Sequence, residues 1–173
     1  MKFLSLMGVA ALASASMAVP AFAQTLTPVG PTLSASGPAL LNTTSCTLTL
    51  PVTATGTGST GTAANGTNTG AGACPTIKIN LNPPDAPATF VLSAYNPTGG
   101  AAGLGSATGT ISNVIVRAGA GSPPPQACPT GNGLTFTVEN RAGGGVRITF
   151  PTTTVGPCTL RATLDAPGFT LNP

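Results

Sequence analysis

The four cysteines of this chain, Cys46, Cys74, Cys128 and Cys158, have the most readily assigned chemistry. An even number of cysteines predicts disulfides in a chain that leaves the cytoplasm. Four cysteines allow three pairings, and their spacing favours two local bridges, Cys46–Cys74 and Cys128–Cys158. A zinc site is disfavoured because the chain has no CxxC pair and no histidine. Each bridge would stabilise the fold by about 3–4 kcal/mol by restricting the unfolded chain.

Three carboxylates, Asp85, Glu139 and Asp165, are the remaining candidates for acid–base chemistry. A glycosidase needs two carboxylates on one sugar ring, and nothing in this spacing brings two together. Glu139 is better explained as a cross-strand partner of Arg147. The sequence also lacks a GxSxG elbow and a phosphate-binding loop. We therefore expect no catalytic, cofactor-binding or metal-binding residues, and a protein that is not an enzyme.

Charged residues make up only 5% of the chain, against about 25% in a usual soluble domain. Outside the first 23 residues the charges are too scattered to form a phosphate-binding patch, so nucleic acid is excluded as a partner. Sparse charge gives little repulsion between copies, and strand edges without lysine favour pairing. We expect the partner to be the chain itself, as a homo-oligomer or fibre, or an apolar substrate or surface.

The first 23 residues resemble a signal peptide. Lys2 precedes an apolar stretch, and Ala21-Phe22-Ala23 forms a small-x-small cleavage pattern before Gln24. A membrane anchor is the alternative, but small residues dilute the hydrophobicity of this stretch. We expect a secreted protein of a Gram-negative-type bacterium, in the periplasm, on the outer surface or outside the cell. No membrane span is expected after cleavage, because no later run reaches about 20 apolar residues.

The rest of the chain has the alternating pattern of half-buried strands. Phe136, Val138, Ile148 and Leu160 are predicted to face the core, with Thr135, Thr137 and Thr149 facing solvent. Gly or Pro interrupts the pattern at short intervals, which excludes long helices. The prediction is all-β: one antiparallel, immunoglobulin-like two-sheet β-sandwich of about 7–8 strands over residues 24–173, stapled by disulfides. A flexible Thr/Gly-rich loop is expected around residues 55–72.

Several segments resemble a known family. They are TLTPVGPTLSASG after the leader, CTLTLPVTAT at the first cysteine, and GPCTLRATLDAPGFTLNP at the end. The order of these segments resembles the secreted PraB-like family, the protein activators of alkane oxidation. The most specific part is the pattern G-x-C-T-[LI]-x-x-x-L…P-x-F-T over residues 156–170. The chain departs from the family in having no Trp and in its Thr/Gly-rich stretch.

This resemblance implies an exported accessory protein linked to growth on hydrocarbons and to surface or biofilm material. It brings no catalytic residues. A second resemblance is to pilin-like sandwiches, which also hold an early disulfide. That alternative implies a structural subunit of a fibre assembled by strand exchange, with residues 24–41 as the donor strand.

Overall fold

A computed structural model describes residues 24–80, 85–118, 126–129, 133–155 and 158–173. The signal peptide expected at residues 1–23 lies outside the described residues. The described chain is built of strands and one short 3-10 helix, η1 (Cys74–Thr76). The strands are β1 (Thr25–Thr27), β2 (Thr32–Leu41), β3 (Thr44–Thr55), β4 (Thr60–Ala63), β5 (Gly66–Thr69), β6 (Lys78–Ile79), β7 (Ala88–Asn96), β8 (Ser106–Ser112), β9 (Ile115–Ala118), β10 (Gln126–Pro129), β11 (Leu134–Asn140), β12 (Val146–Val155), β13 (Cys158–Ala166) and β14 (Thr170–Asn172).

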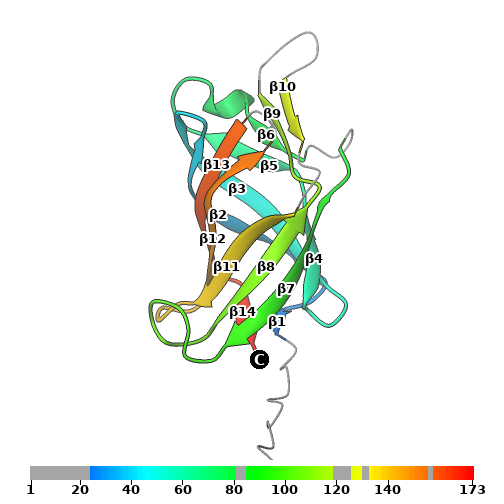
Figure 1. Ribbon diagram of the computed structural model, residues 1–173, viewed down its shortest axis with the longest axis vertical. Helices are drawn as coiled ribbons and strands as arrows, with labels where there is room; N and C mark the ends of the chain where they lie inside the picture. Colours follow the sequence, from blue (N-terminus) through cyan, green and yellow to red (C-terminus); the bar gives the residue numbers. More distant parts are fainter. Residues whose placement is uncertain (1–23, 81–84, 119–125, 130–132, 156–157) are drawn as a thin grey trace, which may run out of the picture.

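Eight of these strands form a closed antiparallel barrel, in the order β3-β2-β13-β12-β11-β8-β7-β4 and back to β3 (Figure 1). The predicted immunoglobulin-like two-sheet sandwich is therefore wrong, although the all-β assignment is correct. The ring closes where the second half of β3 pairs with β4, from Val52↔Ala63 to Thr55↔Thr60. A strand with one apolar face fits a sandwich and a barrel equally well, so alternation alone could not distinguish them.

The ends of the barrel are covered by shorter elements. The first half of β3 pairs with β5, and the sheet continues through β6 and β9 to β10 beyond the barrel. At the opposite end, β1 and β14 form a two-stranded sheet (Figure 1). Leu26 of β1 and Leu171 of β14 are each 2% exposed, so this small sheet packs on the barrel core. Within the described residues, no helix has the length and apolar character needed to cross a membrane.

The Thr/Gly-rich stretch 55–72, expected as a flexible loop, contains β4 and β5. A glycine explains how β4 packs against β7. Gly61 lies opposite Phe90 of β7, and a Cβ at Gly61 would come 2.3 Å from the Phe90 ring. The aromatic ring therefore covers the glycine, and this cross-strand packing offsets the low strand propensity of the segment.

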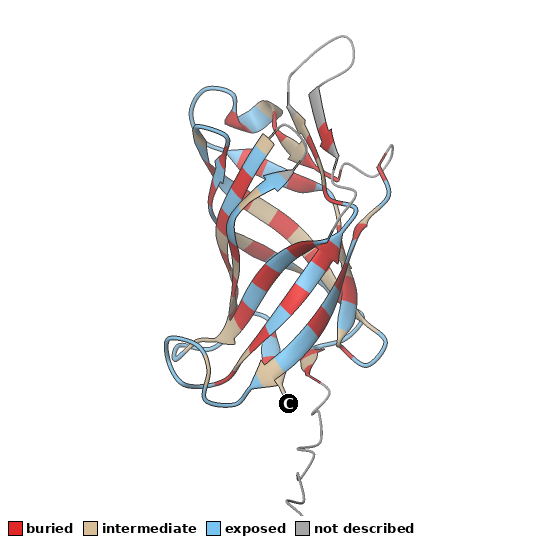
Figure 2. Cartoon of the chain, viewed as in Figure 1, coloured by how far each residue is buried: buried red, intermediate tan, exposed pale blue. Residues whose placement is uncertain are grey.

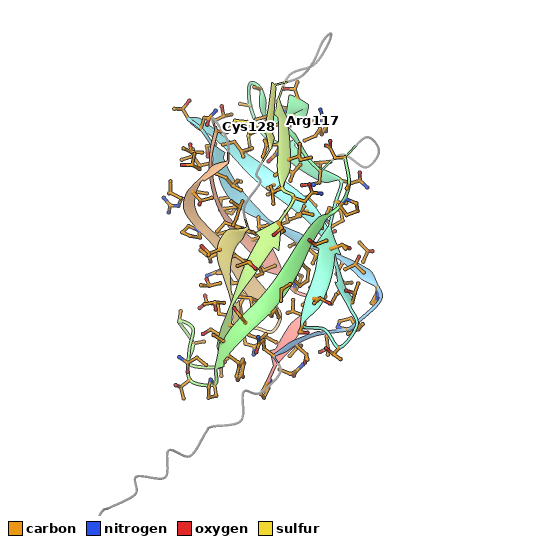
Figure 3. The ribbon with its side chains drawn as sticks, turned by 45° about the vertical axis from the view of Figure 1, so that its right-hand side comes forward. Arg117 and Cys128 are labelled. Atoms are coloured by element: carbon orange, nitrogen blue, oxygen red, sulfur yellow. A yellow bond between two sulfur atoms is a disulfide. The ribbon has the colours of Figure 1, made fainter. Side chains whose placement is uncertain are left out.

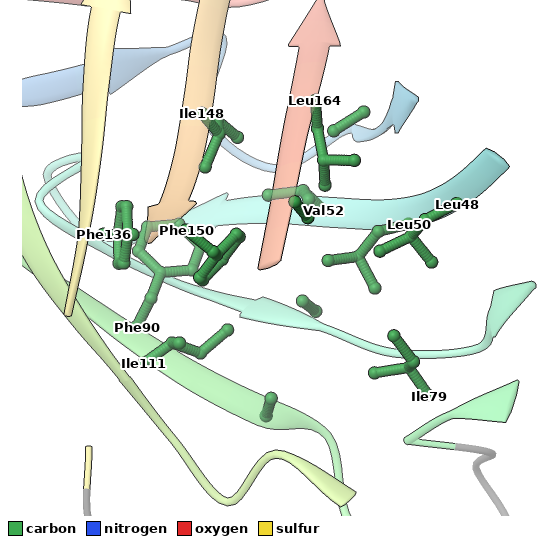
Figure 4. Close-up of a cluster of buried hydrophobic side chains, with 14 of the residues drawn as sticks. Leu48, Leu50, Val52, Ile79, Phe90, Ile111, Phe136, Ile148, Phe150 and Leu164 are labelled. Atoms are coloured by element: carbon green, nitrogen blue, oxygen red, sulfur yellow. The ribbon is translucent and has the colours of Figure 1, made fainter. Parts of the chain in front are cut away.

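The core is the barrel interior, and buried residues alternate with more exposed ones along most of the barrel strands (Figure 2). The rings of Phe90 and Phe136 have centroids 6.3 Å apart in an edge-on arrangement, and those of Phe136 and Phe150 are 5.5 Å apart (Figure 4). Gly109 of β8 makes room for Phe136, because a Cβ there would lie 2.5 Å from the ring. Aromatic rings placed over glycines thus fill the barrel.

The predicted core positions are confirmed. All of them are at most 7% exposed: Phe136, Val138, Ile148 and Leu160. Thr135 and Thr137 are exposed and Thr149 is half-buried. The alternation breaks at Ala94, which has a φ of 39° at a register shift in β7 and is exposed.

Both expected disulfides are present. Cys46–Cys74 joins β3 to η1, and Cys128–Cys158 joins β10 to the start of β13. The bridges close loops with sequence separations of 28 and 30 residues. Cys128–Cys158 therefore ties the β5–β6–β9–β10 extension to the barrel, and Cys46–Cys74 does the same for η1, which lies between β5 and β6 in the sequence.

Candidate functional site

The three carboxylates are not gathered into one site. Asp85 is buried and is paired with Arg117 of β9 through both carboxylate oxygens, with Arg117 Nε 2.8 Å from Asp85 Oδ2. Arg117 lies at the same end of the molecule as Cys128 (Figure 3). This ion pair links the segment that begins at Asp85 to β9 of the extension. The sequence alone did not predict this contact.

The other two carboxylates lie on one cross-strand row, in the order Glu139, Arg147, Asp165. Glu139 and Arg147 are cross-strand neighbours, as predicted, but no ion pair between them is among the contacts of the described residues. Arg147 instead binds Asp165 through two nitrogens, at 2.9 and 3.2 Å, and Glu139 Oε2 accepts a hydrogen bond from the backbone N–H of Ala101 at 2.8 Å. Glu139 therefore orders a loop, while Asp165 receives the guanidinium.

The environment of Asp165 stabilises its charged form. The hydrogen bonds from Arg147 lower the pKa of Asp165, and the positive charges of Arg147 and Arg141 act in the same direction. Partial burial opposes them. The Arg141 guanidinium lies 3.3 Å from the carboxylate, and both side chains are over one-third exposed. This is an exposed charge network of modest stabilising effect.

The barrel interior is filled by side chains. It retains cavities of about 30 Å³ and about 20 Å³, lined mostly by apolar residues such as Leu50, Phe90 and Ile111. Small-molecule sites usually occupy roughly 300–1,000 Å³. Eight-stranded barrels either hold one small ligand or are filled by side chains, and this barrel is of the filled kind.

The outside of the barrel is divided by charge. No charged residue lies in β2, β3, β4, β7 or β8, all of whose residues the structure describes. These five strands are consecutive neighbours in the barrel. We call their outward side chains the uncharged wall. The charged side chains of the barrel lie on or beside the remaining strands, β11, β12 and β13: Glu139, Arg141, Arg147, Arg161 and Asp165.

The uncharged wall carries hydroxyl groups in cross-strand register. One row crosses five neighbouring strands and consists of Thr32, Thr53, Thr62, Thr89 and Ser112. A second row begins on the wall and runs onto β11, β12 and β13: Ser93, Thr108, Thr137, Thr149 and Thr163. The row between them contains Val91, which is 51% exposed. Several hydroxyls bond to one another, as in Thr32–Thr53 at 2.7 Å.

This surface presents methyl groups and mutually bonded hydroxyls without charge. Threonine satisfies part of its hydrogen bonding within such rows, which lowers the cost of covering the surface. The arrangement is suited to contact with neutral material. The Thr alternation was visible in the sequence, but the strand order was needed to show that the uncharged strands are neighbours.

The predicted cysteine sites are thus structural disulfides, and among the residues that the structure describes no group of three or more potential metal ligands is found. Over residues 1–173 the chain matches the family described as alkane oxidation protein activator PraA/PraB-like. Comparison with curated proteins and with solved structures gives no match. The match covers the whole chain, so this protein belongs to the PraA/PraB-like family of alkane oxidation protein activators.

Proposed function

We propose that the protein is an exported, non-catalytic accessory factor of alkane oxidation that acts at the cell surface or outside, by adsorbing to apolar material or to surface matrix. The observation that carries the proposal is the uncharged wall, five neighbouring strands without a charged side chain. Moving a charged group from water to an apolar phase is far more costly than moving a hydroxyl. An uncharged surface can therefore approach a hydrocarbon phase at lower cost than a charged one.

The packed interior supports the same proposal. A carrier that encloses a long alkane needs a cavity much larger than the interior ones of about 30 and 20 Å³ that the described residues line. Adsorption through the outer surface needs no cavity. The closed barrel also keeps its backbone hydrogen bonds internal, so its wall can meet an apolar phase without exposing strand edges.

Fibre assembly by donation of residues 24–41 receives no support from the structure. β1 is paired with β14, and β2 is paired with both β3 and β13 inside the same chain. Donation of this segment would require those pairings to be broken first.

Charge placed on the wall tests the proposal. Thr108 and Thr110 both point outward from β8 and are exposed. The double variant Thr108→Lys/Thr110→Lys should adsorb more slowly to a hexadecane–water interface, measured by pendant-drop tension, and should fail to restore growth on hexadecane to a strain lacking the protein. The matched control, Thr154→Lys/Thr170→Lys, adds the same charge at exposed positions outside the wall. Equal adsorption by the two variants would contradict the proposal.

The non-catalytic part has its own test. Glu139→Gln and Asp165→Asn each remove a carboxylate without changing side-chain size. Both residues lie outside the core, so the variants should fold and should keep the growth phenotype. A folded carboxylate variant that has lost function would indicate acid–base chemistry.

A further inference from the structure

A groove lies on the outside of the barrel between β2 and β13, at the boundary between the uncharged wall and the charged strands. Its volume is about 260 Å³, and it is lined by Pro38, Ala39, Leu40, Ser45, Arg161 and Thr163, together with buried Ala162. We call it the Arg161 groove. It differs from the small cavities of the barrel interior, since Ala162 is the one lining residue that it shares with either of the two described above.

The groove follows from the local sequence of β2. Register between β2 and β13 runs from Leu41↔Leu160 to Ala39↔Ala162 and resumes only at Ser36↔Asp165. Proline has no N–H to donate, so Pro38 interrupts the ladder at this point. Gly37 allows close approach of the strands, since a Cβ there would overlap the carbonyl oxygen of Thr163.

The walls of the groove are apolar on one side and cationic on the other. Leu40 is 39% exposed, a high value for leucine, and Pro38 beside it is also exposed. Arg161 lies directly across from Leu40 in the register. Among the contacts of the described residues, the Arg161 guanidinium has no ion pair or hydrogen bond. Its donors are therefore open to a ligand.

We propose that the Arg161 groove binds a fatty-acid anion, with Arg161 holding the carboxylate and with Leu40 and Pro38 contacting the first part of the alkyl chain. A guanidinium binds a carboxylate through two parallel hydrogen bonds, which a neutral alkane or an alcohol cannot form. The groove volume is just below the roughly 300 Å³ of the smallest usual ligand sites, so it suits a head group and a short length of chain.

This inference rests on the proposed function and makes it more specific. Terminal oxidation converts an alkane, which has no polar group, into a chain with a carboxylate at one end. The uncharged wall does not distinguish the two by charge, whereas the Arg161 groove does. The protein would then meet hydrocarbon through its wall and retain oxidised chains at the groove.

The test is an NMR titration of the exported protein with dodecanoate below its micelle concentration, following Arg161 Nε–Hε and the Leu40 methyl groups. We expect saturable shifts at both. Arg161→Gln should weaken binding at least tenfold, and Leu40→Ser should weaken it by a smaller factor. The matched control Arg141→Gln removes the same charge at a residue paired with Asp165 and should leave the affinity unchanged. Both groove side chains are exposed, so the variants should unfold at the temperature of the unsubstituted protein.

The inference would be overturned if dodecanoate showed no saturable binding, or if Arg161→Gln bound dodecanoate as tightly as the unsubstituted protein does. It would also be overturned if 1-dodecanol or dodecyltrimethylammonium bound as tightly as dodecanoate. Tighter binding of a leucine-terminated peptide, lost on amidation of its carboxylate, would also overturn it in favour of a protein partner. Interfacial adsorption of Arg161→Gln, measured alongside, separates this inference from the proposed function. If the unsubstituted protein adsorbs to the interface but does not bind dodecanoate, only the inference about the Arg161 groove is rejected. If the unsubstituted protein does not adsorb, the proposed function is rejected.

Discussion

Replacing Gly109 with alanine should destabilise the barrel through steric overlap of the new Cβ with its neighbours. The new Cβ would lie 2.5 Å from Cζ of Phe136 and 2.9 Å from the carbonyl oxygen of Val91. Both separations are well below van der Waals contact, so the Phe136 ring must move inside a packed core. Overpacking of this kind costs about 1–3 kcal/mol. For a domain of this size that corresponds to a fall in Tm of roughly 2–12 °C.

The assay is urea unfolding of the oxidised protein, with Gly143→Ala as the matched control. Gly143 lies in the turn between β11 and β12, and its Cβ would meet nothing within 4 Å, so its substitution should change stability by less than about 0.5 kcal/mol. The cost of Gly109→Ala should also shrink in a Phe136→Leu background, because the ring atom that it meets is gone. Equal costs for the two glycine variants, or an unchanged cost beside leucine, would refute the packing argument.

Three further outcomes are expected. Phe136→Ala should cost about 3–5 kcal/mol, whereas Thr137→Ala on the outer face should cost about 1 kcal/mol or less, as measured by chemical unfolding. Asp165 has a lowered folded-state pKa, so its contribution is present above the unfolded value of about 4 and is lost as pH falls through the folded value. The stability difference between the unsubstituted protein and Asp165→Asn should accordingly disappear in acid, and a difference that persists at pH 2 would exclude this linkage. Replacing Cys128 and Cys158 together with serine should lower the unfolding free energy by about 3–4 kcal/mol, and no change would show that the bridge does not restrict the unfolded chain.

The sequence was sufficient to predict strands, core faces and disulfides, because each depends on local spacing. The inward set Phe136, Val138 and Ile148 could be assigned from alternation alone. Closure depends on β4, a four-residue strand whose composition is typical of a loop. It is stabilised there by the ring of Phe90 covering Gly61, a contact between distant segments that no local pattern contains.

Prediction of the candidate surface was limited in the same way. The small number of charged residues was evident from composition. That those of the barrel lie on or beside three neighbouring strands, β11, β12 and β13, follows only from the barrel order. The pairing of Glu139 with Arg147 was inferred from their correct register, and it failed because Asp165 on the other neighbouring strand binds the same guanidinium. Which of Glu139 and Asp165 binds Arg147 cannot be decided until β13 is known to lie beside β12.

The pairing of β2 with β13 has a consequence for how the chain folds. Most neighbours in the barrel are close in sequence, whereas this pairing joins Leu41 to Leu160, and β1–β14 joins Thr25 to Asn172. Contacts between segments so far apart in sequence slow folding, because the chain loses the entropy of closing a long loop before the stabilising contacts form. The barrel therefore cannot be completed until almost the whole chain is available. A chain that lacks β13 leaves β2 and β12 each without one of its two neighbouring strands. If the chain is exported unfolded, as the proposed function implies, the barrel stays open between β2 and β13 until β13 has emerged on the far side of the membrane.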